Sequence, residues 1–191
     1  MARHFKRRTG GGASIILEAF EIDLLRDCAE QLLELLGPAD GPAGDDPLAA
    51  ALHHGPSDAP DDPALKRLFP DAYGDEDDEA RNASAEFRRF TENDLRARKR
   101  TDALALIASL DAAGDLGRRG ADVRLDADQC RHWLGTLNDL RLAFASRLGI
   151  GAEGDDRALL RLPDDDPRKA TASVYFWLTW LQDNLVEAMM R

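Results

Sequence analysis

The sequence contains only two cysteines, Cys28 and Cys130, which lie far apart along the chain. They cannot form the dense disulfide framework of small secreted domains. Thiols stay reduced in the cytosol, so this composition favours a cytoplasmic protein. Both cysteines fall on apolar stripes of expected helices, which predicts two small buried residues. If the two helices pack with the Cα atoms of the cysteines within about 7 Å, the sequence allows a redox-active disulfide between them.

Long apolar runs are also missing, and none approaches the roughly 20 residues that a membrane helix needs. The basic N-terminus, Met1 to Arg8, is followed by Gly10-Gly11-Gly12, so we expect no signal peptide. The 191 residues, 43% of them hydrophobic, support one domain with a real core. Within it, residues 38–82 are rich in Pro, Gly, Asp and Ala, which predicts a mobile insertion. Asp46-Pro47 and Asp62-Pro63 indicate two short helices there, because each places a capping carboxylate before a proline.

The motifs of common catalytic and metal sites are absent from the sequence. There is no CxxC, no HExxH and no glycine-rich phosphate loop. Of the four histidines, His53 and His54 lie in the insertion, and His132 is two positions from Cys130, so the two point to different faces of a helix. We therefore expect a protein without enzymatic activity, cofactor or metal, although paired carboxylates stay open among the 36 acidic residues.

The net charge of −11 repels DNA and anionic membranes, so DNA is not the expected main ligand. Two clusters of basic residues nevertheless occur in this acidic chain. The first follows an expected edge strand, where it could block aggregation or contact phosphates. The second lies in a long helix with acids four positions earlier, which favours a salt-bridged face, or else a face that binds a partner. The patches are Arg3, Lys6, Arg7 and Arg8, and then Arg96, Arg98, Lys99 and Arg100.

Apolar spacing predicts a mainly helical α+β fold built around a bundle of four main helices. The expected helices span residues 17–36, 83–113, 126–149 and 167–190, with Asn82 or Ser84 as the cap of the second. An N-terminal hairpin turning at Gly10-Gly11-Gly12 and a strand at 121–125 predict a small antiparallel sheet. The first and last helices carry more apolar residues than one stripe needs, so the sequence also allows a homodimer that buries the extra apolar surface.

Arg141 lies between Leu137 and Phe144 on a mostly apolar helix face. A lone buried charge costs several kcal/mol, so we expect a paired arginine. The predicted structural polar network comprises Asp94, Asn138, Asp139 and Arg141, with Asp94, Asp139 or Glu92 supplying the carboxylate. The three tryptophans, Trp133, Trp177 and Trp180, are expected in the core.

Several blocks of the sequence together resemble the actinobacterial AosR-like family of oxidative stress regulators. They are AEFRRFTENDLR (85–96), LGTLNDLRL (134–142) with RLGI (147–150), YFWLTWLQ (175–182), FKRR (5–8) and LFPDAY (68–73). The resemblance covers nearly the whole chain. It implies a cytosolic regulator, often encoded beside the ClpS adaptor and cysteine-biosynthesis genes, with redox-dependent control of transcription through a sigma factor.

Redox sensing in such a family is expected to use a cysteine pair. This chain has no closely spaced pair, so only Cys28 with Cys130 could serve. The leading hypothesis is a regulator that binds a transcription protein such as a sigma factor, its acidic surface meeting a basic partner. The alternatives are an accessory factor of ClpS and Clp proteolysis, and a regulator that binds DNA directly.

Overall fold

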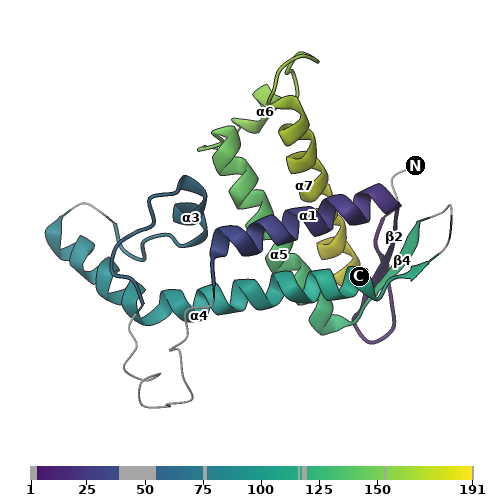
Figure 1. Ribbon diagram of the computed structural model, residues 1–191, viewed down its shortest axis with the longest axis horizontal. Coiled ribbons are helices and arrows are strands. Elements are labelled where there is room, and N and C mark those ends of the chain that lie inside the picture. Colours follow the sequence, from purple (N-terminus) through teal and green to yellow (C-terminus); the bar gives the residue numbers. More distant parts are fainter. Residues whose placement is uncertain are drawn as a thin grey trace.

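The structure is a computed structural model that describes residues 4–38, 55–74, 77–115, 117, 120–152 and 154–190. Four long helices dominate this part: α1 (Ala19–Leu36), α4 (Asp78–Asp111), α5 (Ala127–Leu148) and α7 (Lys169–Met190). Two short helices, α3 (Pro63–Leu68) and α6 (Asp156–Leu159), accompany them. The predicted mainly helical α+β fold is confirmed (Figure 1).

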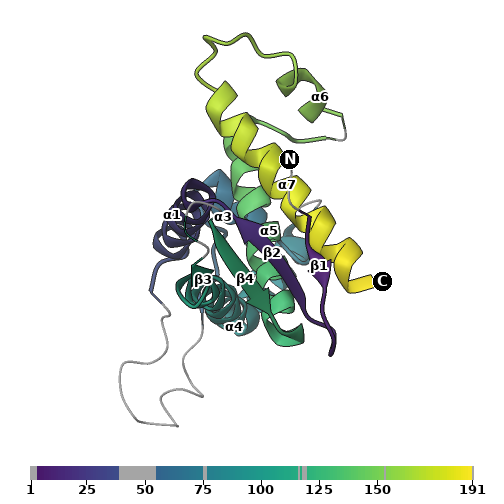
Figure 2. The same cartoon turned by 90° about the vertical axis from the view of Figure 1, so that its right-hand side faces the viewer.

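A four-stranded antiparallel sheet lies at one end of the helices, in the order β1-β2-β4-β3 (Figure 2). Its strands are β1 (Lys6–Arg7), β2 (Ala13–Leu17), β3 (Gly114–Asp115) and β4 (Ala121–Leu125). The predicted N-terminal hairpin turns at Gly10 and Gly11, whose φ angles of 81° and 82° favour glycine. The strand predicted at 121–125 pairs with β2 along its whole length. Strand β3 was not predicted, because its two residues are too few to form a periodic pattern.

The helix boundaries follow their caps more than their apolar stripes. Asp126 and Gln129 form the predicted capping box of α5. The expected cap of α4 is wrong, because Asp77 accepts the hydrogen bond from the backbone N–H of Ala80 and starts the helix at Asp78. The helix therefore begins five positions before residue 83, and Ser84 lies inside it.

Helix α5 is the central element of the core. It packs against α4, α7, α3 and α1, and Figure 1 shows α1 and α4 running side by side in front of it. Trp133 of α5 is fully buried and meets the Phe5 ring edge to face, with centroids 6.0 Å apart. Trp177 and Trp180 are half-buried at the edge of the same core. None of the described helices combines the length and apolarity needed to cross a membrane.

The expected insertion at 38–82 divides into parts of different character. Residues 39–54, with the helix predicted at Asp46-Pro47, and residues 75–76 lie outside the described residues. The second short helix is present as α3, where the Asp62 carboxylate accepts hydrogen bonds from the backbone of Ala64 and Leu65. The insertion is shorter than expected at its end, since residues 78–82 belong to α4.

Candidate partner-binding site

The N-terminal part of α4 carries exposed aromatic side chains, beside the segment that follows α3. Phe87 is 49% exposed, Phe90 60% and Tyr73 53%. The rings of Tyr73 and Phe87 meet edge to face, with centroids 6.3 Å apart. Large aromatics left in water at one place are typical of a surface that another molecule covers. We call these three residues the aromatic surface.

A cleft of about 220 Å³ adjoins the aromatic surface. Phe69, Pro70 and Ala72 line it from the segment after α3, and Phe87 and Leu95 line it from α4. Its lining is mostly apolar, which suits an apolar side chain of a partner.

A buried ion network lies along the α4 wall of the cleft. Arg88, only 5% exposed, donates hydrogen bonds to Glu92 (Nη1 to Oε2, 2.6 Å), to the Asp71 carboxylate (2.7 Å) and to the carbonyl of Phe69 (3.1 Å). Burial disfavours the charged guanidinium, but the bonds to Asp71 and Glu92 outweigh it and hold the pKa of Arg88 above its usual value. The network thus ties residues 69–71 to α4.

Glu92 extends this network towards α1. It is 3% exposed, and its second oxygen accepts a hydrogen bond from Arg96 at 2.5 Å. Arg96 also donates to the carbonyl of Leu36 at the end of α1, and its guanidinium stacks 4.5 Å from the centre of the Phe69 ring. One carboxylate thereby holds two arginines that reach different elements.

The backbone below the aromatic surface is fixed as well. The Ser84 hydroxyl accepts a hydrogen bond from the Tyr73 N–H and donates one to the Tyr73 carbonyl, both at 3.1 Å. A surface whose backbone and neighbours are already held loses little entropy on binding. The cleft and its aromatic rim are therefore preorganised.

The predicted partner-binding residues of the basic run mostly face inwards. Arg100 donates to the carbonyls of Leu33 and Gly37, and so caps the C-terminal end of α1 together with Arg96. Lys99 forms an ion pair with Asp139 at 2.6 Å. Arg98 is the member of the run that is exposed.

The predicted polar network around Arg141 is divided in the structure. Arg141 donates to Thr179 (3.0 Å) and Gln182 (2.6 Å) of α7, so the expected carboxylate partner is wrong. Asp139 pairs instead with Lys99, and burial raises the pKa of Asp139 although Lys99 and Asn138 act in the opposite direction. Asp94 is exposed on α4.

The two cysteines are buried and free, and they face different places along α5. Cys28 shares a small cavity with Leu140 and Arg147. The Cys130 thiol instead lies in the first turn of α5 and is hydrogen-bonded to the backbone of Ala13. The ten positions from 130 to 140 span about 15 Å of helix, well beyond disulfide reach. Burial raises the pKa of both thiols, and that of Cys28 reaches about 11. The fold therefore does not bring this pair together.

The other histidine and acidic groups that the structure describes do not assemble into a metal centre. His132 pairs with Asp102 of α4 at 2.7 Å. The described residues contain no cluster of three His, Cys, Asp or Glu suited to a metal ion.

Similarity to known proteins shows to which family the chain belongs. Residues 2–189 match the family model described as a domain of unknown function, DUF2017. The chain belongs to this family. It is 32% identical to the oxidative stress regulator AosR of Mycobacterium tuberculosis and to that of Mycobacterium bovis, over all of this chain and 89% of each relative. The putative oxidative stress regulator AosR of Mycobacterium leprae is 31% identical, over 92% of this chain and 81% of its own length. No solved structure matches the chain.

The resemblance inferred from the sequence blocks is thus confirmed for the DUF2017 chain. Sequence reasoning nevertheless missed Arg88 and Asp71, the centre of the candidate site. The repeated spacing of four between Arg88, Glu92 and Arg96 is a signal that could have indicated an ion-paired row. No local signal joins Asp71 to Arg88, because the loop after α3 has to fold back onto α4 first.

Proposed function

We propose that this chain is a non-enzymatic regulator of the oxidative stress response that binds a protein of the transcription machinery, such as a sigma factor. The link to the stress response rests on its relatives, which are oxidative stress regulators. The observation that carries the binding role is the aromatic surface of Tyr73, Phe87 and Phe90 beside a preorganised cleft. The net charge of −11 favours a basic partner.

A redox-dependent form of this function would require a rearrangement that brings the two cysteines together. Cys28 and Cys130 face separate stretches of α5, so a disulfide between them needs α1 and the N-terminal end of α5 to leave their places. A thiol with a pKa of about 11 also reacts slowly with oxidants, since the thiolate is the reactive form. A thiol switch would therefore act in an opened form of the protein.

Photo-crosslinking in the host tests the proposal. A benzophenone amino acid at Phe90 should capture a sigma factor or an RNA polymerase subunit, and Phe87→Ser in the same chain should abolish the capture. The matched control places the crosslinker at Leu104, which is 52% exposed on α4 outside the cleft. Phe87, Phe90 and Leu104 are all at least 49% exposed, so the fold should be unaffected.

The identity of the captured protein decides between the alternatives. ClpS or a Clp ATPase alone would move the function to proteolysis. Equal capture from Phe90 and Leu104 would show that the aromatic surface is not the binding site. Repeating the capture with an oxidant, in wild type and Cys28→Ser, tests redox dependence, which the thiol switch predicts to disappear in the variant.

A further inference from the structure

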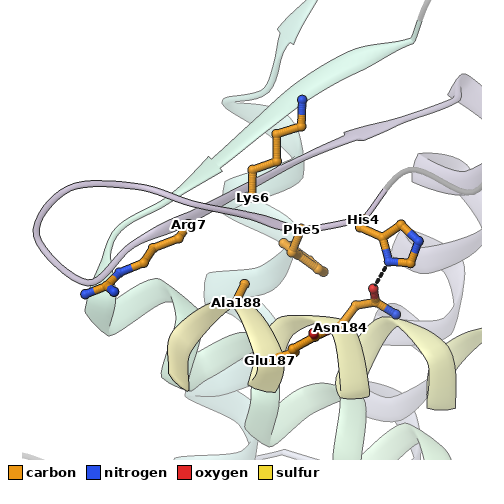
Figure 3. Close-up of a pocket in the computed structure, with 7 residues that line it drawn as sticks. All are labelled: His4, Phe5, Lys6, Arg7, Asn184, Glu187 and Ala188. Atoms are coloured by element: carbon orange, nitrogen blue, oxygen red, sulfur yellow. Dashed lines mark hydrogen bonds between the residues drawn. The ribbon is translucent and has the colours of Figure 1, made fainter. Parts of the chain in front are cut away.

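A second groove lies at the opposite end of the molecule, between β1 and the last turns of α7 (Figure 3). It measures about 630 Å³ and is lined by residues 4–7 on one side and by Asn184, Glu187 and Ala188 on the other. Figure 2 shows β1 between β2 and α7, so the groove follows the outer side of the first strand.

The backbone of β1 directs hydrogen-bonding groups away from β2 and towards this groove. Among the described strands β1 has β2 as its neighbour, with Lys6 opposite Ser14 and Arg7 opposite Ala13. The Arg8 N–H donates to the carbonyl of Gly12, and antiparallel strands alternate between bonded and non-bonded pairs. The N–H and C=O of Arg7 therefore point away from β2, towards the groove that Arg7 lines. An edge with such groups is the template for strand addition.

The segment that leads into β1 is held by side-chain contacts with α5 and α7. Phe5 is buried against Trp133, and the His4 ring packs on Trp180 with centroids 5.3 Å apart. The side-chain N–H of Asn184 donates to the Trp180 carbonyl at 2.7 Å. The side-chain oxygen of Asn184 therefore faces His4 and accepts a hydrogen bond from its Nδ1–H. The edge is thus ordered before any ligand arrives.

The charge of this edge is opposite to that of the whole chain. Lys6, Arg7 and Arg8 are all exposed in a protein of net charge −11. Of the described residues that line the groove, Glu187 alone is acidic. Lys6 and Arg7 extend to different sides of the strand in Figure 3, so cationic groups flank the path that an added strand would follow.

We propose that this groove binds an acidic peptide segment in extended conformation, which adds to the sheet beside β1. The backbone of the segment would pair with the N–H and C=O of Arg7, and its carboxylates would meet Lys6 and Arg7. The site is separate from the aromatic surface and does not depend on the function proposed for it.

Selection from a display library of random decapeptides tests the inference, with the folded full-length chain as bait. Selected peptides should be rich in Asp and Glu alternating with apolar residues. Fluorescence anisotropy with such a peptide then compares three variants. Arg7→Gln removes the charge and keeps the N–H, whereas Arg7→Pro removes both without touching the bonds to β2. Arg8→Gln removes the same charge outside the groove.

We expect Arg8→Gln to weaken binding least and Arg7→Pro to weaken it at least about tenfold, as for the loss of a backbone pairing and a charge together. Hydrogen exchange should show the Arg7 amide newly protected by the peptide in the wild type. Unchanged thermal unfolding of Arg7→Pro shows that the fold is intact. Selected peptides without acidic bias, or peptides that bind Arg7→Pro as tightly as wild type, would overturn the proposal. Displacement of the peptide by short duplex DNA at equal concentration would overturn it too, in favour of phosphate binding.

Discussion

Replacing Glu92 with glutamine keeps the shape of the side chain but removes the negative charge that Arg88 and Arg96 share. The carboxylate accepts one hydrogen bond from each arginine, at 2.6 and 2.5 Å, and is 3% exposed. The glutamine amide would offer an oxygen to one guanidinium and an N–H group to the other, so one arginine would face a donor. Breaking a buried ion pair on one side costs about 3–5 kcal/mol, because a buried charge loses its partner.

Urea unfolding measures this loss. With a slope of about 2 kcal/mol/M for a chain of this size, the midpoint should fall by about 1.5–2.5 M. The matched control is Glu86→Gln, which removes the same charge from an exposed position of the same helix. Exposed ion pairs contribute at most about 1 kcal/mol, so the control should move the midpoint little.

A second variant separates the loss of charge from simple intolerance of change at this site. Arg88→Met with Glu92→Leu removes the most buried ion pair of the network, and well-packed apolar replacements of buried pairs are often neutral. Arg96 stays, with its side chain 15% exposed and its bond to the Leu36 carbonyl intact, and the half-exposed Asp71 carboxylate stays as well. The double variant should therefore be more stable than Glu92→Gln. If Glu92→Gln and Glu86→Gln shift the midpoint equally, the buried network does not stabilise the fold more than an exposed charge does.

Three further predictions concern the cysteine, the sheet and the buried aspartate. With its pKa raised to about 11, Cys28 should react with iodoacetamide at least about a hundredfold more slowly than an unperturbed thiol at pH 8, followed by mass spectrometry. Gly120→Ala should destabilise the protein by at least about 2 kcal/mol in thermal unfolding, because φ is +90° and the new Cβ would lie 1.9 Å from the carbonyl oxygen of Leu17, whereas Gly114→Ala meets its nearest atom at 3.9 Å and should not. Burial raises the pKa of Asp139, so the folded state binds the carboxyl proton more tightly than the unfolded chain does. The wild type should therefore lose stability relative to Asp139→Asn as the pH rises from the unfolded pKa of this group through its folded pKa. A stability difference between the two proteins that stays constant with pH would contradict this prediction.

Local patterns in the sequence predicted the elements better than the contacts between them. The apolar spacing and capping residues located the long helices to within a few positions, and the three glycines located the hairpin. The start of α4 was misplaced because Asn82 and Ser84 are good caps in isolation, while Asp77 satisfies the first turn in the fold. Capping propensity alone cannot choose between competing caps on one helix.

The inward direction of the basic run could not be predicted for a different reason. Arg96 and Arg100 turn inwards because α4 runs alongside α1 as far as its end, where the last carbonyls need donors. That need arises only when two elements far apart in sequence meet. In the same way Arg141 finds neutral partners on α7, since Thr179 and Gln182 lie opposite it once α5 and α7 pack.

The two proposed surfaces should act independently, because they lie towards opposite ends of α4. Phe90 is in the N-terminal half of the helix, and the sheet packs on its C-terminal end near Leu110, about 30 Å away at 1.5 Å per residue. Mutations this far apart with no shared partner usually add within about 0.5 kcal/mol. Phe90→Ser should therefore leave the anisotropy titration of an acidic peptide unchanged, and Arg7→Pro should leave crosslinking at Phe90 unchanged. A peptide affinity that changes more than about twofold in Phe90→Ser would mean that the rigid α4–α5 pair transmits binding from one end to the other, as a regulator with two coupled sites would require.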